Sequence, residues 1–99
     1  MQSKVKQVAD TLKLLANGNR LQILCALIDG PKTVTALGLK VSDITQSALS
    51  QHLALLKANG IVSDQKSGQS VTYSIADRRV EEVIAVLKRN YCDWDVETP

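Results

Sequence analysis

The chain has 99 residues, 44% of them hydrophobic, and a net charge of +2. This length and composition predict one globular domain with a modest core and exclude a disordered chain. The sequence holds neither the run of about 20 apolar residues that crosses a membrane nor a signal-peptide core, so we expect a cytoplasmic protein without membrane association. Residues 1–76 carry eight Lys/Arg and four Asp/Glu, whereas residues 77–99 carry four and six, which places the basic excess in the longer N-terminal segment.

Amphipathic periodicity predicts a first helix over residues 3–16, with one apolar stripe made of Val5, Val8, Leu12 and Leu15. In so small a domain this stripe packs either within the subunit or against a second copy, and periodicity alone leaves both open. Asn17 is a suitable N-cap for a second helix, which ends near Asp29 before Gly30-Pro31. Cys25 falls on the apolar face of this helix, where a cysteine is commonly a small core residue.

A short third helix is predicted over residues 33–41, interrupted by Gly38, and a turn leads into a fourth helix over residues 45–59. In the fourth helix Leu49, Leu53 and Leu56 face inward, whereas its first two turns present short polar side chains. A short helix, a turn and a helix with a polar front are typical of a helix-turn-helix. Short uncharged donors and acceptors in this position suit base edges and phosphates.

After Gly60 the hydrophobic period changes to two, which predicts a β-hairpin, or wing, over residues 61–75. Lys66 and Gln69 lie near its tip, where they suit a phosphate or the minor groove, although solvated hairpin tips commonly have this composition too. Asp77 is placed to cap a last helix over residues 78–92, and residues 93–99 form a short acidic tail. The last helix carries a second terminal apolar stripe: Val80, Val83, Ile84, Leu87 and Tyr91.

These elements predict one mainly α domain over residues 1–92: four helices, a β-hairpin wing and a last helix, which is a winged helix-turn-helix. The sequence also resembles the ArsR/SmtB family of bacterial winged-helix repressors over about residues 5–92. The resemblance rests on Leu-Leu-Ala at residues 14–16, Asn-Arg-Leu-Gln-Ile-Leu at residues 19–24 and Gln-Ser-Ala-Leu-Ser-Gln-His-Leu at residues 46–53. It continues through Leu-Lys at residues 56–57 and Gly-Ile-Val at residues 60–62.

The resemblance implies a homodimer that binds inverted-repeat double-stranded operator DNA and releases it when an inducer binds. The implied dimer interface is made by the first and last helices: Val5, Val8, Leu12, Val80, Val83, Ile84, Leu87 and Tyr91. The implied DNA-binding residues are Thr45, Gln46, Ser47, Ser50, Gln51 and His52, with Lys66 and Gln69 of the wing. For His52, the one histidine of the chain, a phosphate contact, a bond within the helix and packing at the helix edge stay open.

Cys25 and Cys92 resemble the cysteine pair of the sulfur- and redox-responsive branch of the family, the BigR, YgaV, SqrR and HlyU type. That resemblance implies that oxidants or reactive sulfur species bridge the pair and weaken DNA binding. Three alternatives stay open: haem as the inducer, a thiophilic metal bridged across subunits, and cysteines that are only structural. The closely spaced cysteines of metal-sensing relatives and the histidines of their last helix are missing here. We therefore expect no metal site and no cofactor.

Two features depart from the family pattern. Gly18 stands where the family often has proline, and the segment between Val34 and Thr45 is about one residue longer than in close relatives. The turn before the fourth helix is therefore expected to differ, and operator preference with it. A winged helix used only for protein contacts is a more distant interpretation, since the polar front lacks large apolar anchors. The sequence shows no acid/base pair, phosphate loop or metal triad, so we expect no enzyme.

Overall fold

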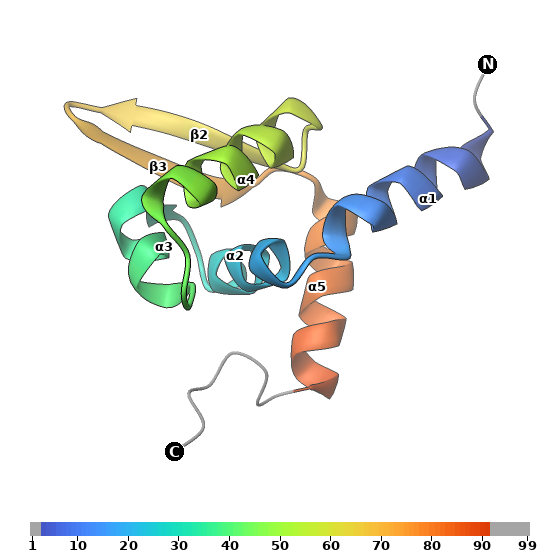
Figure 1. The fold of residues 1–99 in the computed structure, drawn as a ribbon. Helices are drawn as coiled ribbons and strands as arrows, with labels where there is room; N and C mark the ends of the chain where they lie inside the picture. The colour runs from blue at the N-terminus through green and yellow to red at the C-terminus, as the bar shows by residue number, and fades with distance from the viewer. Residues whose placement is uncertain (1–2, 92–99) are drawn as a thin grey trace.

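The computed structural model describes residues 3–91, which form five helices and three strands (Figure 1). In chain order these are α1 (Lys4–Leu15), α2 (Gly18–Ile28), β1 (Lys32–Thr33), α3 (Val34–Lys40), α4 (Gln46–Ala58), β2 (Val62–Ser67), β3 (Ser70–Ile75) and α5 (Arg78–Asn90). The structure confirms the predicted mainly helical fold with a β-hairpin wing. Within the described residues, no helix is long and apolar enough to cross a membrane.

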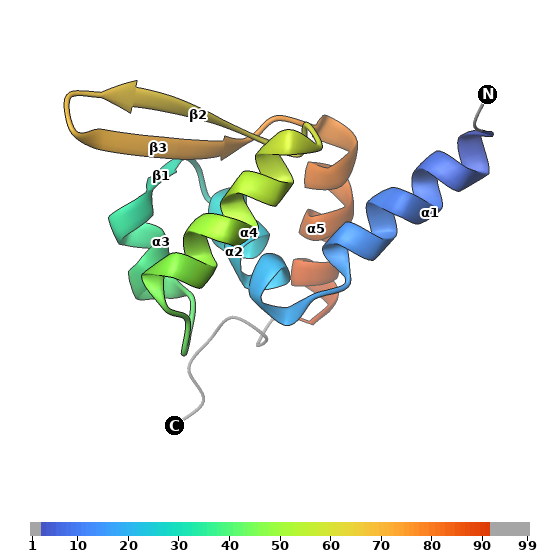
Figure 2. The ribbon, with the colours of Figure 1, turned by 45° about the horizontal axis from the view of Figure 1, so that its top comes forward.

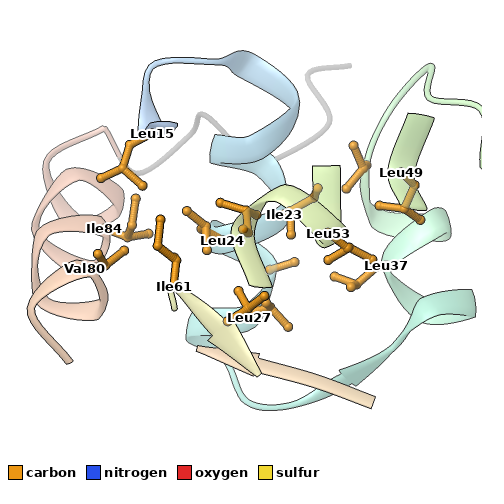
Figure 3. Close-up of a cluster of buried hydrophobic side chains, with 14 residues drawn as sticks. Leu15, Ile23, Leu24, Leu27, Leu37, Leu49, Leu53, Ile61, Val80 and Ile84 are labelled. Carbon is orange, nitrogen blue, oxygen red and sulfur yellow. The ribbon is translucent and has the colours of Figure 1, made fainter. Parts of the chain in front are cut away.

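The core is built around α2, in which five consecutive residues, Ile23 to Leu27, are buried. A helix that is buried nearly all round must be covered by several neighbours. Figure 3 shows these neighbours: Leu37 of α3, Leu49 and Leu53 of α4, and Ile84 of α5 converge on it. The core is aliphatic, as a chain without phenylalanine requires.

Each helix begins at a side chain that accepts a hydrogen bond from a backbone N–H of the first turn, because those N–H groups have no partner within the helix. Asn17, Thr45 and Asp77 cap α2, α4 and α5 as their sequence positions predict. Thr33 caps α3, which continues without a break through Gly38. The predicted interruption at Gly38 is therefore wrong. Tertiary packing overrides the weak helix propensity, since Leu37 beside it is fully buried.

The sheet has three antiparallel strands in the order β1-β3-β2, one more than the predicted hairpin. The additional strand β1 pairs Lys32 with Tyr73 and Thr33 with Thr72. A strand of two residues has no periodicity of its own, so only its partner defines it. By pairing with β3, β1 attaches the root of the wing to the segment between α2 and α3.

Both ends of the wing meet at Ile61. Its carbonyl accepts hydrogen bonds from the N–H of Ala76 at 2.8 Å and from that of Asp77 at 3.3 Å. Its own N–H donates to Leu56 O at 3.0 Å, and Gly60, with a φ of +74°, donates to Lys57 O. These two bonds make a Schellman motif, which fixes the end of α4. The helix α4, the wing and the start of α5 are thus joined at one residue.

Replacing Asp77 by alanine is expected to lower the free energy of unfolding by about 1 kcal/mol at neutral pH, because the cap of α5 is lost. Asp77 Oδ1 accepts from Arg79 N at 2.9 Å, and the Arg79 guanidinium contacts both carboxylate oxygens. The hydrogen bond from the Arg79 side chain is the largest cause that lowers the pKa of Asp77 below its usual 3.8. Such a carboxylate stabilises the fold above its unfolded pKa, and the contribution disappears as the pH falls through the folded value.

Urea unfolding at about pH 7 and about pH 3 checks this prediction. The Asp77→Asn variant is the control, since asparagine keeps the cap but lacks the charge. The difference between the wild type and Asp77→Ala should shrink in acid. A difference that is the same at both pH values would show that the carboxylate charge plays no part.

Candidate DNA-binding surface

The helix α4 is held rigidly by its inner face. Leu49, Leu53 and Leu56 are at most 2% exposed and lie in the core. Thr45 Oγ1 accepts from Ala48 N at 3.0 Å at one end of the helix, and the Schellman motif closes the other. Side chains on the outer face of α4 therefore project from a fixed axis.

The outer face of α4 begins with a continuous polar patch. The five predicted residues at its amino end are all exposed: Thr45, Gln46, Ser47, Ser50 and Gln51. Thr45 uses an oxygen lone pair for its cap, but its O–H hydrogen remains available to donate. Together these side chains offer hydroxyl and amide groups that both donate and accept, as base edges and phosphates require.

The wing projects beyond α4 on the side of the molecule away from α1 (Figures 1 and 2). Its strands pair in register from Val62↔Ile75 to Ser67↔Ser70, so Gly68 and Gln69 form the tip. Gly68 has a φ of +61°, which glycine adopts without strain. Lys66 and Gln69 are exposed at this end of the hairpin. The domain therefore presents two exposed polar regions, the wing tip with Lys66 and the polar patch at the amino end of α4.

His52 differs from the other predicted residues because it is half-buried. Its Nδ1 lies 3.5 Å from Nη1 of Arg20, the third residue of α2. Sequence reasoning assigned no role to Arg20. The two residues are 32 positions apart, and only the packing of α2 against α4 brings them together.

The turn between α3 and α4 is fastened to α2. Gln22 Oε1 accepts a hydrogen bond from Ser42 N at 3.1 Å. The next residue, Asp43, has a φ of +54°, a left-handed conformation that non-glycine residues adopt at a cost. The segment between α3 and α4 thus contains a tight turn held by a side chain from the core helix.

The predicted dimer residues divide into an exposed and a buried set. Val5 is 78% exposed, Val8 51% and Leu12 52%; Val83 of α5 and Tyr91, which follows α5, are exposed as well. A groove between α1 and the start of α5 is lined in part by Val8, Leu12 and Val83. These exposed apolar side chains leave one face of α1 and one face of α5 uncovered in the protomer.

The assignment of Val80 and Ile84 to a dimer interface is corrected by the structure. Val80 is 3% exposed and Ile84 0%, because both pack into the core of their own protomer, and Leu87 is half-buried against it. Periodicity identifies an apolar stripe but does not say which chain covers each member. Val86, 45% exposed on α5, was not assigned from the sequence.

Cys25 is fully buried in α2, and Cys92 lies outside the described residues. The backbone around Cys25 contacts the end of α5, since Lys88 Nζ donates to Cys25 O at 3.4 Å and pairs with Asp29 Oδ2 at 3.1 Å. Among residues 3–91, no three His, Cys, Asp or Glu side chains gather closely enough to hold a metal ion.

The chain matches a family model described as bacterial regulatory protein, arsR family, over residues 17–64. The transcriptional activator HlyU of Vibrio cholerae is 44% identical over 81 residues, which are 82% of this chain and 74% of HlyU. The transcriptional regulator YgaV of Escherichia coli is 36% identical over 93% of each chain. A biofilm growth-associated repressor of Agrobacterium fabrum is 34% identical over 93% of this chain and 78% of its own length.

Solved structures agree with these relatives. The structure of HlyU from Vibrio cholerae superposes with a TM-score of 0.85 at 40% identity, covering 93% of this chain and 99% of that one. A homodimeric winged helix-turn-helix DNA-binding domain from Mycobacterium bovis superposes with a TM-score of 0.75 at 32% identity, covering 93% and 89%. These relatives are transcriptional regulators and not enzymes. The chain therefore belongs to the arsR family of bacterial regulatory proteins.

Proposed function

We propose that this regulator is a cytoplasmic homodimeric repressor that binds an inverted-repeat operator and releases it when Cys25 and Cys92 are oxidised or bridged by sulfur. The observation that carries the DNA-binding part is the exposed polar patch at the amino end of α4 on a helix fixed by buried leucines. A helix of 13 residues is about 20 Å long and fits the major groove, which is about 12 Å wide. The wing tip, with Lys66 and Gln69, would reach the adjacent backbone or minor groove.

The uncovered apolar faces of α1 and α5 support the dimer. Dimerisation is favoured when a second copy removes exposed apolar side chains such as Val5 and Leu12 from water. The structural neighbour from Mycobacterium bovis is described as homodimeric. A two-fold dimer would place two copies of α4 in successive major grooves, about 34 Å apart, which matches an inverted repeat.

Repression is the simplest outcome for a small domain that covers an operator. The relatives include both an activator, HlyU, and a repressor from Agrobacterium fabrum, so the direction of regulation needs its own measurement. Transcription in vitro from a promoter that contains the operator provides it. Repression requires fewer transcripts when reduced protein is added, and more transcripts would assign the chain to the activators.

Alanine at Gln51 is expected to weaken operator binding by about 30-fold or more, since each of the two protomers loses one base contact that contributes about 1–3 kcal/mol. Ser47→Ala should have a smaller effect in the same direction. Fluorescence anisotropy on a labelled duplex taken from upstream of the gene measures both. Glu81→Gln, on the exposed face of α5, is the control and should bind as the wild type does. Loss of the dimer in Gln51→Ala would show that this face of α4 lies in the subunit interface instead.

The contact between α2 and α5 supports the cysteine switch. Lys88 precedes Cys92 by four residues and reaches the carbonyl of Cys25. In the proposed reaction the two thiols lose two protons and transfer two electrons to an oxidant as the S–S bond forms. With a sulfane-sulfur donor, one sulfane sulfur would enter the bridge, and a second would accept the two electrons and the two protons and leave as hydrogen sulfide. Because Cys25 is 0% exposed, the packing around it must open before the thiol reacts. A bridge would then fix α5 against α2 and change how the dimer carries the two copies of α4.

Operator binding by the reduced protein is expected to weaken after treatment with a sulfane-sulfur donor and to return with reductant. Cys25→Ala and Cys92→Ser should each bind the operator and lose this response, since neither can form the bridge. Anisotropy at fixed salt measures the response, and mass spectrometry identifies the bridge. A variant that still responds fully would remove that cysteine from the sensor. An unresponsive wild type would leave a repressor with a different inducer.

A further inference from the structure

The Arg20 side chain is fixed between three helices. Its Nε donates to the carbonyl of Leu14, near the end of α1, at 2.6 Å. Its backbone N–H donates to Asn17 Oδ1 at 3.1 Å, which is part of the cap of α2. Its Nη1 lies 3.5 Å from Nδ1 of His52 on α4. The Arg20 guanidinium is therefore held in place by contacts that do not involve the His52 imidazole.

The chemistry of the two groups sets the direction of the bond between them. A guanidinium only donates hydrogen bonds and stays protonated, so the imidazole nitrogen that faces it must accept. In a neutral imidazole one nitrogen accepts and the other carries the proton. With Nδ1 facing Arg20, the proton is on Nε2, at the opposite edge of the ring.

We propose that Arg20 is a positioning residue for DNA binding. It holds the neutral His52 ring as the Nε2–H tautomer, so that Nε2–H donates to a phosphate of the operator. The phosphate contact rests on the proposed function, whereas the tautomer does not. His52 follows the exposed Ser50 and Gln51 on α4 and is itself half-buried, so its ring lies at the margin of the polar patch. Contacts to the DNA backbone at such a margin set the register of a recognition helix.

The location of Arg20 supports a role beyond helix stability. It occupies the first turn of α2, which contains no acidic residue. A cation is unfavourable there, because the helix dipole places partial positive charge at the amino end. Arginine also suits the site better than lysine. Its planar fork reaches Leu14 O and His52 at the same time, whereas an ammonium group is a single point of charge.

Two-bond proton–nitrogen correlation spectra of the imidazole test the tautomer without DNA. The chain has one histidine, so the signals need no assignment by mutation. At a pH where the ring is neutral, the wild type should show the pattern of an Nε2-protonated ring. Arg20→Leu should shift the signals towards a mixture of tautomers, while Arg78→Leu, which removes an exposed arginine from α5, should not. A wild-type ring protonated on Nδ1, or a ring unaffected by Arg20→Leu, would overturn the proposal.

Operator titrations test the consequence. His52→Ala should weaken binding about 100-fold, as expected when the dimer loses one hydrogen bond to a charged group in each protomer. Arg20→Leu should weaken it by a similar factor, and the double variant should be little worse than either single one. If the loss of affinity in the double variant equalled the product of the two single losses, Arg20 and His52 would act independently and the positioning role would be overturned. If Arg20→Leu fails to fold, Arg20→Lys replaces it in the test. It should show the same loss of operator affinity, because lysine lacks the planar guanidinium that contacts Leu14 and His52 together.

The salt dependence separates positioning from direct contact. If Arg20 itself neutralised a phosphate, Arg20→Leu would reduce the slope of log affinity against log salt by about two units in a dimer. A positioning role predicts that Arg20→Leu keeps the wild-type slope of log affinity against log salt. A reduced slope in this variant would overturn the positioning role. If the wild type bound no duplex, the proposed function would fail, and the spectra would still decide the Arg20–His52 contact.

Discussion

Operator affinity is expected to fall about 1,000-fold when the salt concentration rises from about 50 to about 200 mM. Residues 1–76, which include α4 and the wing, have a net charge of +4 per protomer. We therefore expect about three phosphate neutralisations from each protomer and about six from the dimer. Each neutralised phosphate releases counterions, and the slope of log affinity against log salt is about −0.9 per contact.

The Lys66→Ala variant makes this prediction specific to the wing. One lysine is lost at each of the two wing tips, so the slope should become shallower by about two units. Lys13→Ala removes an exposed lysine from α1 and is the matched control. Anisotropy titrations at four or more salt concentrations provide the slopes. An affinity that barely changes with salt would exclude the proposed phosphate contacts, and equal slopes for the two variants would exclude the wing.

Glutamate at Leu12 is expected to abolish the dimer and to weaken operator binding by about 100- to 10,000-fold. Leu12 is 52% exposed on α1 and lines the groove beside α5, so a second copy would bury the new charge against apolar side chains. A monomer binds one half-site only and loses the affinity that the second half-site adds, which is about 100- to 10,000-fold for linked binding sites. The fold itself should keep its stability within about 0.5 kcal/mol, as for other exposed positions.

Sedimentation velocity measures the dimer, and thermal unfolding at low protein concentration confirms the intact fold. Leu39→Glu is the matched control, because Leu39 is 87% exposed at the end of α3, away from the apolar stripe of α1. It should remain dimeric. A dimeric Leu12→Glu would show that α1 lies outside the interface, and a monomeric Leu39→Glu would place the interface on α3.

Local signals in the sequence were sufficient for the fold class. The apolar spacing of Leu49, Leu53 and Leu56 predicts the buried face of α4, and Thr45 and Gly60 predict its ends. The alternation of Val71, Tyr73 and Ile75 predicts β3. These features depend on residues within one or two turns of each other, so they need no knowledge of the tertiary structure.

The features that prediction missed depend on contacts between distant residues. The strand β1 exists only because Lys32 and Thr33 pair with β3. Val80 and Ile84 share a stripe with Val83, yet the core of the protomer covers them and leaves Val83 exposed. The polar patch of α4 was predicted as a surface because its residues are neighbours in sequence. The Arg20–His52 contact was not, since it joins two helices.

The junction at Ile61 has a consequence for how this regulator can diversify. The hairpin begins and ends beside Ile61, whose carbonyl accepts from both Ala76 and Asp77, and β1 holds β3 at Thr72 and Tyr73. A loop whose ends are held together can change in length at little cost in closure entropy. Duplication, deletion or exchange of the hairpin tip would thus alter the DNA sequence that is preferred without rotating α4 relative to α5. In evolutionary terms the part of the hairpin beyond the β1 pairing, residues 66–71, is an exchangeable module, and we expect tips from related regulators to be accepted there.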